Sequence, residues 1–129
     1  MISINKTFDA SQLPDNEPLF EVGQLVRHRR YGYRGVVVAS DGRCCADPTW
    51  YMSNQTQPDR DQPWYHVLVH GSNSVTYAAQ SSLQVDESRD PVDHALVEHF
   101  FSSFRNGRYV RNSEPWPGQD HEQQPDVVE

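Results

Sequence analysis

Residues 20–39, FEVGQLVRHRRYGYRGVVVA, decide the fold of this chain. They contain two apolar segments of extended character, residues 22–26 and 35–39, separated by the basic and aromatic segment RHRRYGYR at residues 27–34. Short runs of β-branched residues bounded by turn residues indicate strands. Gly32 can supply the positive φ that a tight turn needs. The stretch therefore predicts two antiparallel strands, the second of which suits a position buried on both faces.

Two later segments extend this sheet. PWYHVLVH at residues 63–70 and VTYAA at residues 75–79 flank the turn sequence GSNS, which predicts a second hairpin. Residues 80–85 fit a short turn followed by a fifth, short strand. The expected fold is mainly β, a small antiparallel sheet of about five strands.

One helix is predicted near the C-terminus, over about residues 91–105. Asp90 is a good N-cap, and Pro91 suits the first helical position. Apolar residues recur at every fourth position, at Val92, Leu96, Phe100 and Phe104. The pair Asn106-Gly107 would then end the helix as its C-cap.

The charge of the chain is unevenly distributed. The net charge is −7, yet residues 20–112 contain ten arginines and ten acidic residues, so the excess lies in residues 1–19 and 113–129. We expect a flexible arm over 1–19, one folded domain over 20–112 and an acidic disordered tail over 113–129. Proteins that hold nucleic acid by phosphate neutralisation alone are basic overall, so any nucleic-acid contact made by this chain must be local.

The connection over residues 41–63 is long for a loop in a small domain, and loops of this length are usually functional or disordered. It contains the aromatic segment Trp50-Tyr51-Met52. Two interpretations stay open: the segment anchors the loop to the sheet, or it forms an exposed contact surface. On the second interpretation the candidate partner-binding residues are Trp50, Tyr51 and Trp64.

No pattern in the sequence indicates catalysis or metal binding. Cys44 and Cys45 are adjacent, which suits neither a disulfide nor a metal site. His66 and His70 would lie roughly 13 Å apart along a strand, too far to share one ion. The nucleophile elbow, P-loop and dinucleotide fingerprint do not occur. We therefore expect no enzyme, no metal and no cofactor.

No targeting or membrane signal stands out. No apolar run approaches the roughly 20 residues that a membrane-spanning helix needs. The N-terminus MISINKTFDA lacks the basic start and apolar stretch of a signal peptide. A cytoplasmic protein without membrane association is therefore expected.

The cationic segment 27–34 is the feature with a clear binding mechanism. Arginine contacts phosphates and guanine edges, and tyrosine stacks on unpaired bases. The alternative is that these arginines pair with acids of the same domain and cover apolar surface with their stems. The candidate nucleic-acid-binding residues are Arg27, His28, Arg29, Arg30, Tyr31, Tyr33 and Arg34.

Several segments in a fixed order carry a resemblance to a known family. They are GQLVRHRRYGYRGVVVASD (residues 23–41), DQPWYHVLV (61–69), VTYAAQSSL (75–83) and FRNGRY (104–109). Together they resemble the YccV-like domain, the family of small heat-shock proteins (HspQ) described as hemimethylated-DNA-binding. The resemblance covers about residues 20–112.

This resemblance implies an SH3-like antiparallel β-barrel of about five strands, a cytoplasmic location, and neither catalysis nor a cofactor. It implies hemimethylated double-stranded DNA as a partner. The bacterial family is also linked to regulated proteolysis, and the domain occurs beside F-box regions. The alternative function is therefore a heat-shock-linked adaptor that binds a protease or a protein substrate. Exposed sheet edges would also permit a homo-oligomer.

Overall fold

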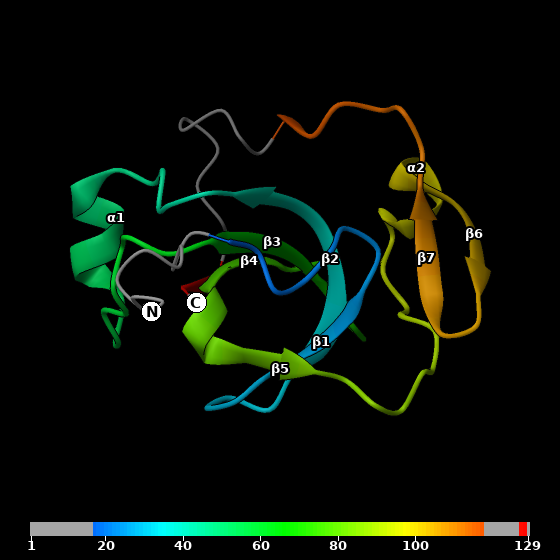
Figure 1. The fold of residues 1–129 in the computed structure, drawn as a ribbon, viewed down its shortest axis with the longest axis horizontal. Helices are drawn as coiled ribbons and strands as arrows, with labels where there is room; N and C mark the ends of the chain where they lie inside the picture. The colour runs from blue at the N-terminus through cyan, green and yellow to red at the C-terminus, as the bar shows by residue number, and fades with distance from the viewer. Residues whose placement is uncertain (1–16, 118–126, 129) are drawn as a thin grey trace, which may run out of the picture.

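A computed structural model describes residues 17–117 together with the strand at 127–128. One sheet has the strand order β5-β1-β2-β3-β4-β8, in which the first five strands are antiparallel and β8 lies parallel to β4 (Figure 1). The strands are β1 (Leu25–His28), β2 (Arg34–Asp41), β3 (Trp64–Val69), β4 (Val75–Ala79), β5 (Leu83–Val85) and β8 (Val127–Val128). The five antiparallel strands expected from the sequence are confirmed.

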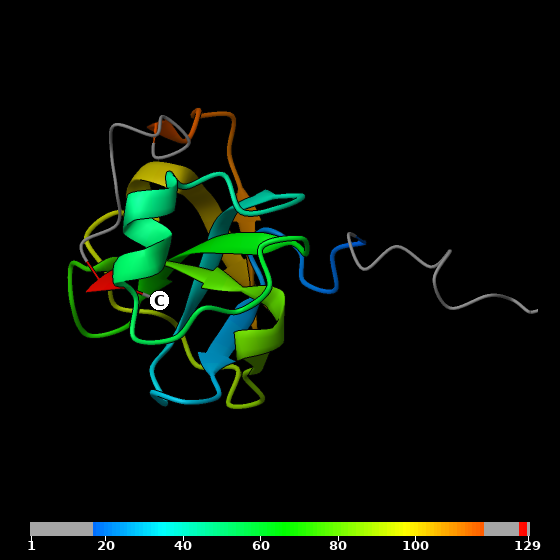
Figure 2. The same ribbon diagram turned by 90° about the vertical axis from the view of Figure 1, so that its left-hand side faces the viewer.

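Smaller elements flank this sheet. The hairpin of β6 (Phe101–Arg105) and β7 (Arg108–Arg111) stands on one side, next to the single-turn helix α2 (Val97–Phe100). Helix α1 (Pro48–Ser53) stands on the opposite side, and the 3-10 turn η2 (Gln80–Ser82) joins β4 to β5. Figure 2, in which α1 faces the viewer, shows the sheet between α1 and the hairpin. Among residues 17–117, no helix is long and apolar enough to cross a membrane.

The sheet is not the closed barrel that was expected. Strand β5 has only three residues and pairs with β1 alone, while β4 pairs with β3 and β8. Closing a barrel would need β4 and β5 to pair along their length. They do not pair within the described chain, where the 3-10 turn η2 joins them.

Strand β2 is buried on both faces, as the valine run predicts. Val36 and Val38 lie in a cluster with Phe101 and Tyr109 of the hairpin. Val37 points to the opposite face, where it packs in a second cluster with aromatic and aliphatic residues of the sheet. The register of β2 against β3 shifts between Val37 and Ala39, so the strand bends at this point.

The helix predicted over 91–105 is wrong for most of its length. Only Val97–Phe100 is helical, and the next residues form β6. Asn106 and Gly107 have φ values of 56° and 75°, so they form the two-residue loop of a β-hairpin instead of a helix cap. The apolar repeat fits both interpretations, but the pairing of β6 with β7 buries Phe101 and Tyr109 together, at a ring distance of 5.2 Å.

Helix α1 anchors the long loop through Trp50, as the first of the two interpretations expects, whereas Met52 is 65% exposed. The Asp47 carboxylate accepts hydrogen bonds from the first-turn N–H groups of Thr49 and Trp50. Trp50 is buried, and its ring lies 6.3 Å from that of Trp64, which is fully buried. Trp50 and Trp64 therefore present no surface to a partner in the folded domain. Tyr51 is half-buried and donates a hydrogen bond to the Pro58 carbonyl.

Within residues 113–117, the partly buried Trp116 packs against the core. Trp116 packs its ring 5.1 Å from Phe100 and 5.5 Å from His66. Residues 113–117 are therefore attached to the domain. The arm and tail expected over 1–19 and 113–129 otherwise lie almost wholly outside the described residues, and their boundaries stay a prediction.

Three glycine substitutions test the junction between the sheet and the hairpin. Gly23 has a φ of 96°, and a Cβ there would overlap the carbonyl oxygen of Tyr109. Gly71 has a φ of 78° but open space, and Gly42 has open space and no positive φ. In urea unfolding we expect Gly42→Ala to be nearly neutral, Gly71→Ala to cost about 1 kcal/mol, and Gly23→Ala about 3 kcal/mol or more. If Gly23→Ala and Gly71→Ala lowered the free energy of unfolding equally, the close approach of the Gly23 and Tyr109 backbones would be contradicted.

Candidate nucleic-acid interface

The β1–β2 turn is built around the buried imidazole of His28. Its Nδ1 accepts hydrogen bonds from the N–H groups of Arg30 and Tyr31, both at 3.1 Å. Its ring stacks between those of Tyr31 and Tyr33, at 4.6 and 5.0 Å. Gly32 completes the turn with a φ of 77°. Since only 1% of His28 is exposed, this residue shapes the turn and does not contact a ligand at the surface.

Asp86 engages two of the four arginines of the turn segment. Arg34 Nε donates to the Asp86 carboxylate at 2.7 Å, and its remaining nitrogens donate to the carbonyls of Asp90 and Pro91. Arg27 Nη2 lies 3.6 Å from the same carboxylate. For Arg34, and in part for Arg27, the structure thus confirms the alternative in which the arginines pair within the domain.

The pKa of Asp86 lies below its ordinary value. Burial alone would raise this pKa, but hydrogen bonds from Arg34 and Ser88, together with the positive charge of Arg34, more than offset the effect. The carboxylate is therefore ionised at neutral pH. It ties the start of β2 to the chain that leaves β5.

The remaining cations of the segment stand at the turn tip, defined as residues 29–31, all of which are exposed. Arg29 donates to the Leu83 carbonyl through Nε at 3.1 Å, which leaves most of its guanidinium donors at the surface. The Arg30 guanidinium lies over the Tyr31 ring, 5.8 Å from its centroid. Neither arginine forms an ion pair within residues 17–117. The tip thus presents two cations and one exposed aromatic ring.

Tyr33 does not belong to this exposed tip. Its hydroxyl is hydrogen-bonded to the Thr76 hydroxyl at 2.8 Å, which ties the base of the turn to β4. Of the seven predicted residues, the structure brings Arg29, Arg30 and Tyr31 together at the surface. It uses the other four wholly or partly in the frame beneath them.

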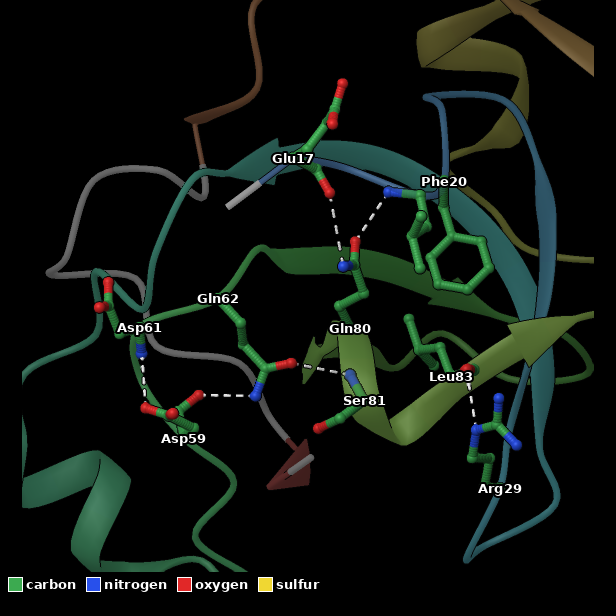
Figure 3. A pocket seen from close by; sticks show the side chains of 10 residues that line it. Glu17, Phe20, Arg29, Asp59, Asp61, Gln62, Gln80, Ser81 and Leu83 are labelled. Atoms are coloured by element: carbon green, nitrogen blue, oxygen red, sulfur yellow. Dashed lines mark hydrogen bonds between the residues drawn. The ribbon is translucent and has the colours of Figure 1, made fainter. Parts of the chain in front are cut away.

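A pocket beside the tip is unsuited to a phosphate (Figure 3). Arg29 stands at one end of it, bound to the Leu83 carbonyl, whereas Asp59 and Asp61 stand at the other end. Glu17 adds a third acidic residue to the lining. Because the acids outnumber the arginine here, a polyanion would be repelled from this side and favoured on the side away from it.

The two cysteine thiols and the possible metal ligands among the described residues are further candidates for chemistry. Burial raises the pKa of both Cys44 and Cys45, so both thiols stay protonated and weakly nucleophilic at neutral pH. In the part of the chain that the structure describes, no three His, Cys, Asp or Glu side chains gather as metal ligands. Binding through the surface is what this arrangement supports.

The structure adds a group of arginines that the sequence reasoning did not assign to a site. Arg89, Arg105 and Arg108 line a pocket between the β6–β7 hairpin and β5. Arg89 donates to the Asn106 carbonyl, and Arg108 pairs with Glu21. The sequence does contain a signal for this group. The Asn106-Gly107 pair is typical of a β-hairpin loop, and a hairpin here places Arg105 and Arg108 side by side next to that loop.

Replacement of Asp86 tests the frame of the turn. Asp86→Asn should lower the free energy of unfolding by about 2 kcal/mol at pH 7, because Arg34 loses its carboxylate partner. The folded-state pKa is depressed, so this contribution is present above the unfolded pKa of about 4 and disappears as the pH falls through the folded value. The difference between wild type and variant in urea unfolding should therefore shrink below about pH 4. The exposed Asp93→Asn serves as control, and a difference independent of pH would contradict the assignment.

Comparison with known proteins places this arrangement in a family. A family model described as "Hemimethylated DNA-binding protein YccV like" matches residues 18–108. F-box only protein 21 of Homo sapiens and that of Mus musculus are each 33% identical to the chain over 98 residues. The match covers 74% of this chain but only 15% and 16% of those proteins, so the chain spans about a sixth of their length. The chain belongs to the YccV-like, hemimethylated DNA-binding family.

Proposed function

We propose that this protein is a non-enzymatic module that binds double-stranded DNA through the turn tip. Arg29 and Arg30 contact phosphates, and Tyr31 packs against the sugar or an unstacked base. The observation that carries the proposal is the pair of exposed arginines without ion-pair partners in residues 17–117, on a turn fixed from below, in a family with this description.

The frame of the turn favours such binding because it is already ordered. His28 holds the backbone of Arg30 and Tyr31 by two hydrogen bonds, and the Arg34–Asp86 pair fixes the base of the turn. A surface that is ordered before binding loses less conformational entropy in the complex. The domain itself is neutral, so few phosphates are neutralised and the affinity should be modest and salt-sensitive.

A single-charge comparison tests this proposal. Arg30→Ala removes a tip cation whose side chain makes no hydrogen bond or ion pair within residues 17–117, whereas Arg29→Ala would also release the turn from β5. Arg43 is exposed just beyond the opposite end of β2, so Arg43→Ala is the matched control. Binding is measured by fluorescence anisotropy on unmethylated, hemimethylated and fully methylated duplexes of one sequence, at several salt concentrations.

Arg30→Ala should weaken binding to all three duplexes by a similar factor. It should also reduce the slope of log K against log salt by about 1, since one phosphate contact is lost. Arg43→Ala should change neither quantity. Equal effects of the two variants, or no binding of the wild-type chain at low salt, would remove the proposal.

A second candidate function, protein binding by an adaptor, is favoured by one observation at the edge of the sheet. Strand β8 lies parallel to β4 and aligns Val127 with Thr76 and Val128 with Tyr77. The β4 edge therefore accepts an extended segment, which is the mode by which many domains bind peptides. In an adaptor, a strand of the partner protein would take the position of β8.

Removal of the tail tests this second candidate. A chain that ends at residue 117 should bind a labelled peptide of residues 118–129 with measurable affinity, whereas the full chain should bind it much more weakly because its own segment competes. Amide chemical shifts of β4 would identify the edge. Equal binding by the two chains would show that β4 is not the peptide site.

A further inference from the structure

A second surface feature lies between β5, the start of β1 and the β6–β7 hairpin. This groove is lined by Val85 and Val110, which are 49% and 46% exposed, over the buried Leu25. The two valines are among the five large apolar side chains that are exposed in the described part of the chain. Together the two valines give the groove a small apolar surface, which suits contact with a small apolar group such as a methyl group.

The rim of the groove is cationic. It carries Arg89, Arg105 and Arg108 against the acidic residues Asp86 and Glu87. Asp86 forms an ion pair with Arg34, and Arg108 forms an ion pair with Glu21, which does not line the groove. Arg105 is exposed and forms no ion pair within residues 17–117, so it is the rim cation best able to bind an anion.

The groove and the turn tip are connected by one strand. Gln24 forms a bridge to Arg108 at the start of β1, and Arg27 lies three residues further along the same strand. At about 3.3 Å per residue, the four steps from Gln24 to His28, the last residue of β1, span about 13 Å, and the turn tip follows directly. Figure 1 shows the β1–β2 turn, β5 and the chain that leaves β5 along the lower rim of the molecule, and this chain runs from β5 toward the loop of the β6–β7 hairpin. One duplex can therefore reach both features.

We propose that this groove is the second half of the DNA surface, in which Arg105 binds a phosphate while Val85 and Val110 contact the methyl group of the modified base. This inference rests on the proposed function and adds to it the site that reads methylation. Apolar side chains contact base methyl groups in the major groove, where they are accessible. The valines are suited to the apolar methyl group of a modified base, and Arg105 is suited to the negatively charged phosphates beside it.

Valine-to-threonine substitutions isolate the methyl contact. Threonine has nearly the same shape as valine and is well accepted in strands, but its hydroxyl weakens an apolar contact. Val110→Thr and Val85→Thr should each reduce the preference for the hemimethylated over the unmethylated duplex, by up to about fourfold, the value of one buried methyl group. Their affinity for the unmethylated duplex should stay unchanged. Met52→Gln, an exposed apolar residue on α1, is the control.

Arg105→Ala tests the rim. It should weaken binding to every duplex about three- to tenfold and reduce the salt slope by about 1, with Arg43→Ala as its matched control. A poly-glutamate peptide is measured in parallel. If Arg105→Ala weakens binding of this peptide but leaves DNA affinity unchanged, the groove binds acidic peptides and the proposal is overturned.

The outcomes separate the two proposals. If the wild-type chain binds DNA in a manner that depends on Arg30, but both threonine variants keep the full methyl preference, the groove is not the reading site and only this inference fails. The same holds if the wild-type chain binds all duplexes equally. If no duplex binds at low salt, the proposed function fails and the inference fails with it.

Discussion

The structure depends on one constraint, which is that strand β2 must bury both of its faces. Val36 and Val38 cannot remain on an open face of a small sheet, so a second layer has to cover them. The β6–β7 hairpin supplies this layer, and it reaches the sheet closely because Gly23 has no side chain between the two backbones. The Tyr109 N–H donates to the Gly23 carbonyl at 2.9 Å, which fixes the hairpin against the start of β1. The same docking brings Arg105 and Arg108, which flank the hairpin loop, to the groove that they share with Val85 of β5.

The burial pattern also decides which arginines remain available for binding. Asp86 is buried, and its carboxylate holds Arg34 closely and Arg27 more loosely. A buried carboxylate without such partners would be costly, so Arg34, and in part Arg27, is used to stabilise it. Arg29 and Arg30 are left at the surface without an acidic partner in residues 17–117. A chain with a net charge of −7 can thus offer a local cationic surface, because pairing inside the domain separates structural arginines from exposed ones.

Much of the sheet follows from the sequence, because strand patterns and turn residues are local signals. The valine run, the glycine at position 32 and the hairpin around GSNS all act over a few residues. The helix over 91–105 was mispredicted because apolar residues at every fourth position also suit a hairpin whose partner strand lies beyond the Asn-Gly pair. The role of Arg34 was unpredictable for another reason, since its partner Asp86 is 52 residues away and only the folded chain brings them together. Likewise, nothing local to His28 shows that its ring is buried beneath the tip, so the sequence placed this residue among the ligand contacts.

The buried position of His28 has a consequence for variation within this fold. The Arg30 side chain contributes little to the core and that of Tyr31 only its stacking on His28, whereas the backbone N–H groups of both residues are held by the buried His28 imidazole. The shape of the turn is thus encoded beneath the residues that it displays. Substitutions at the displayed positions can accumulate with little loss of folding, and ligand preference can change while the scaffold persists.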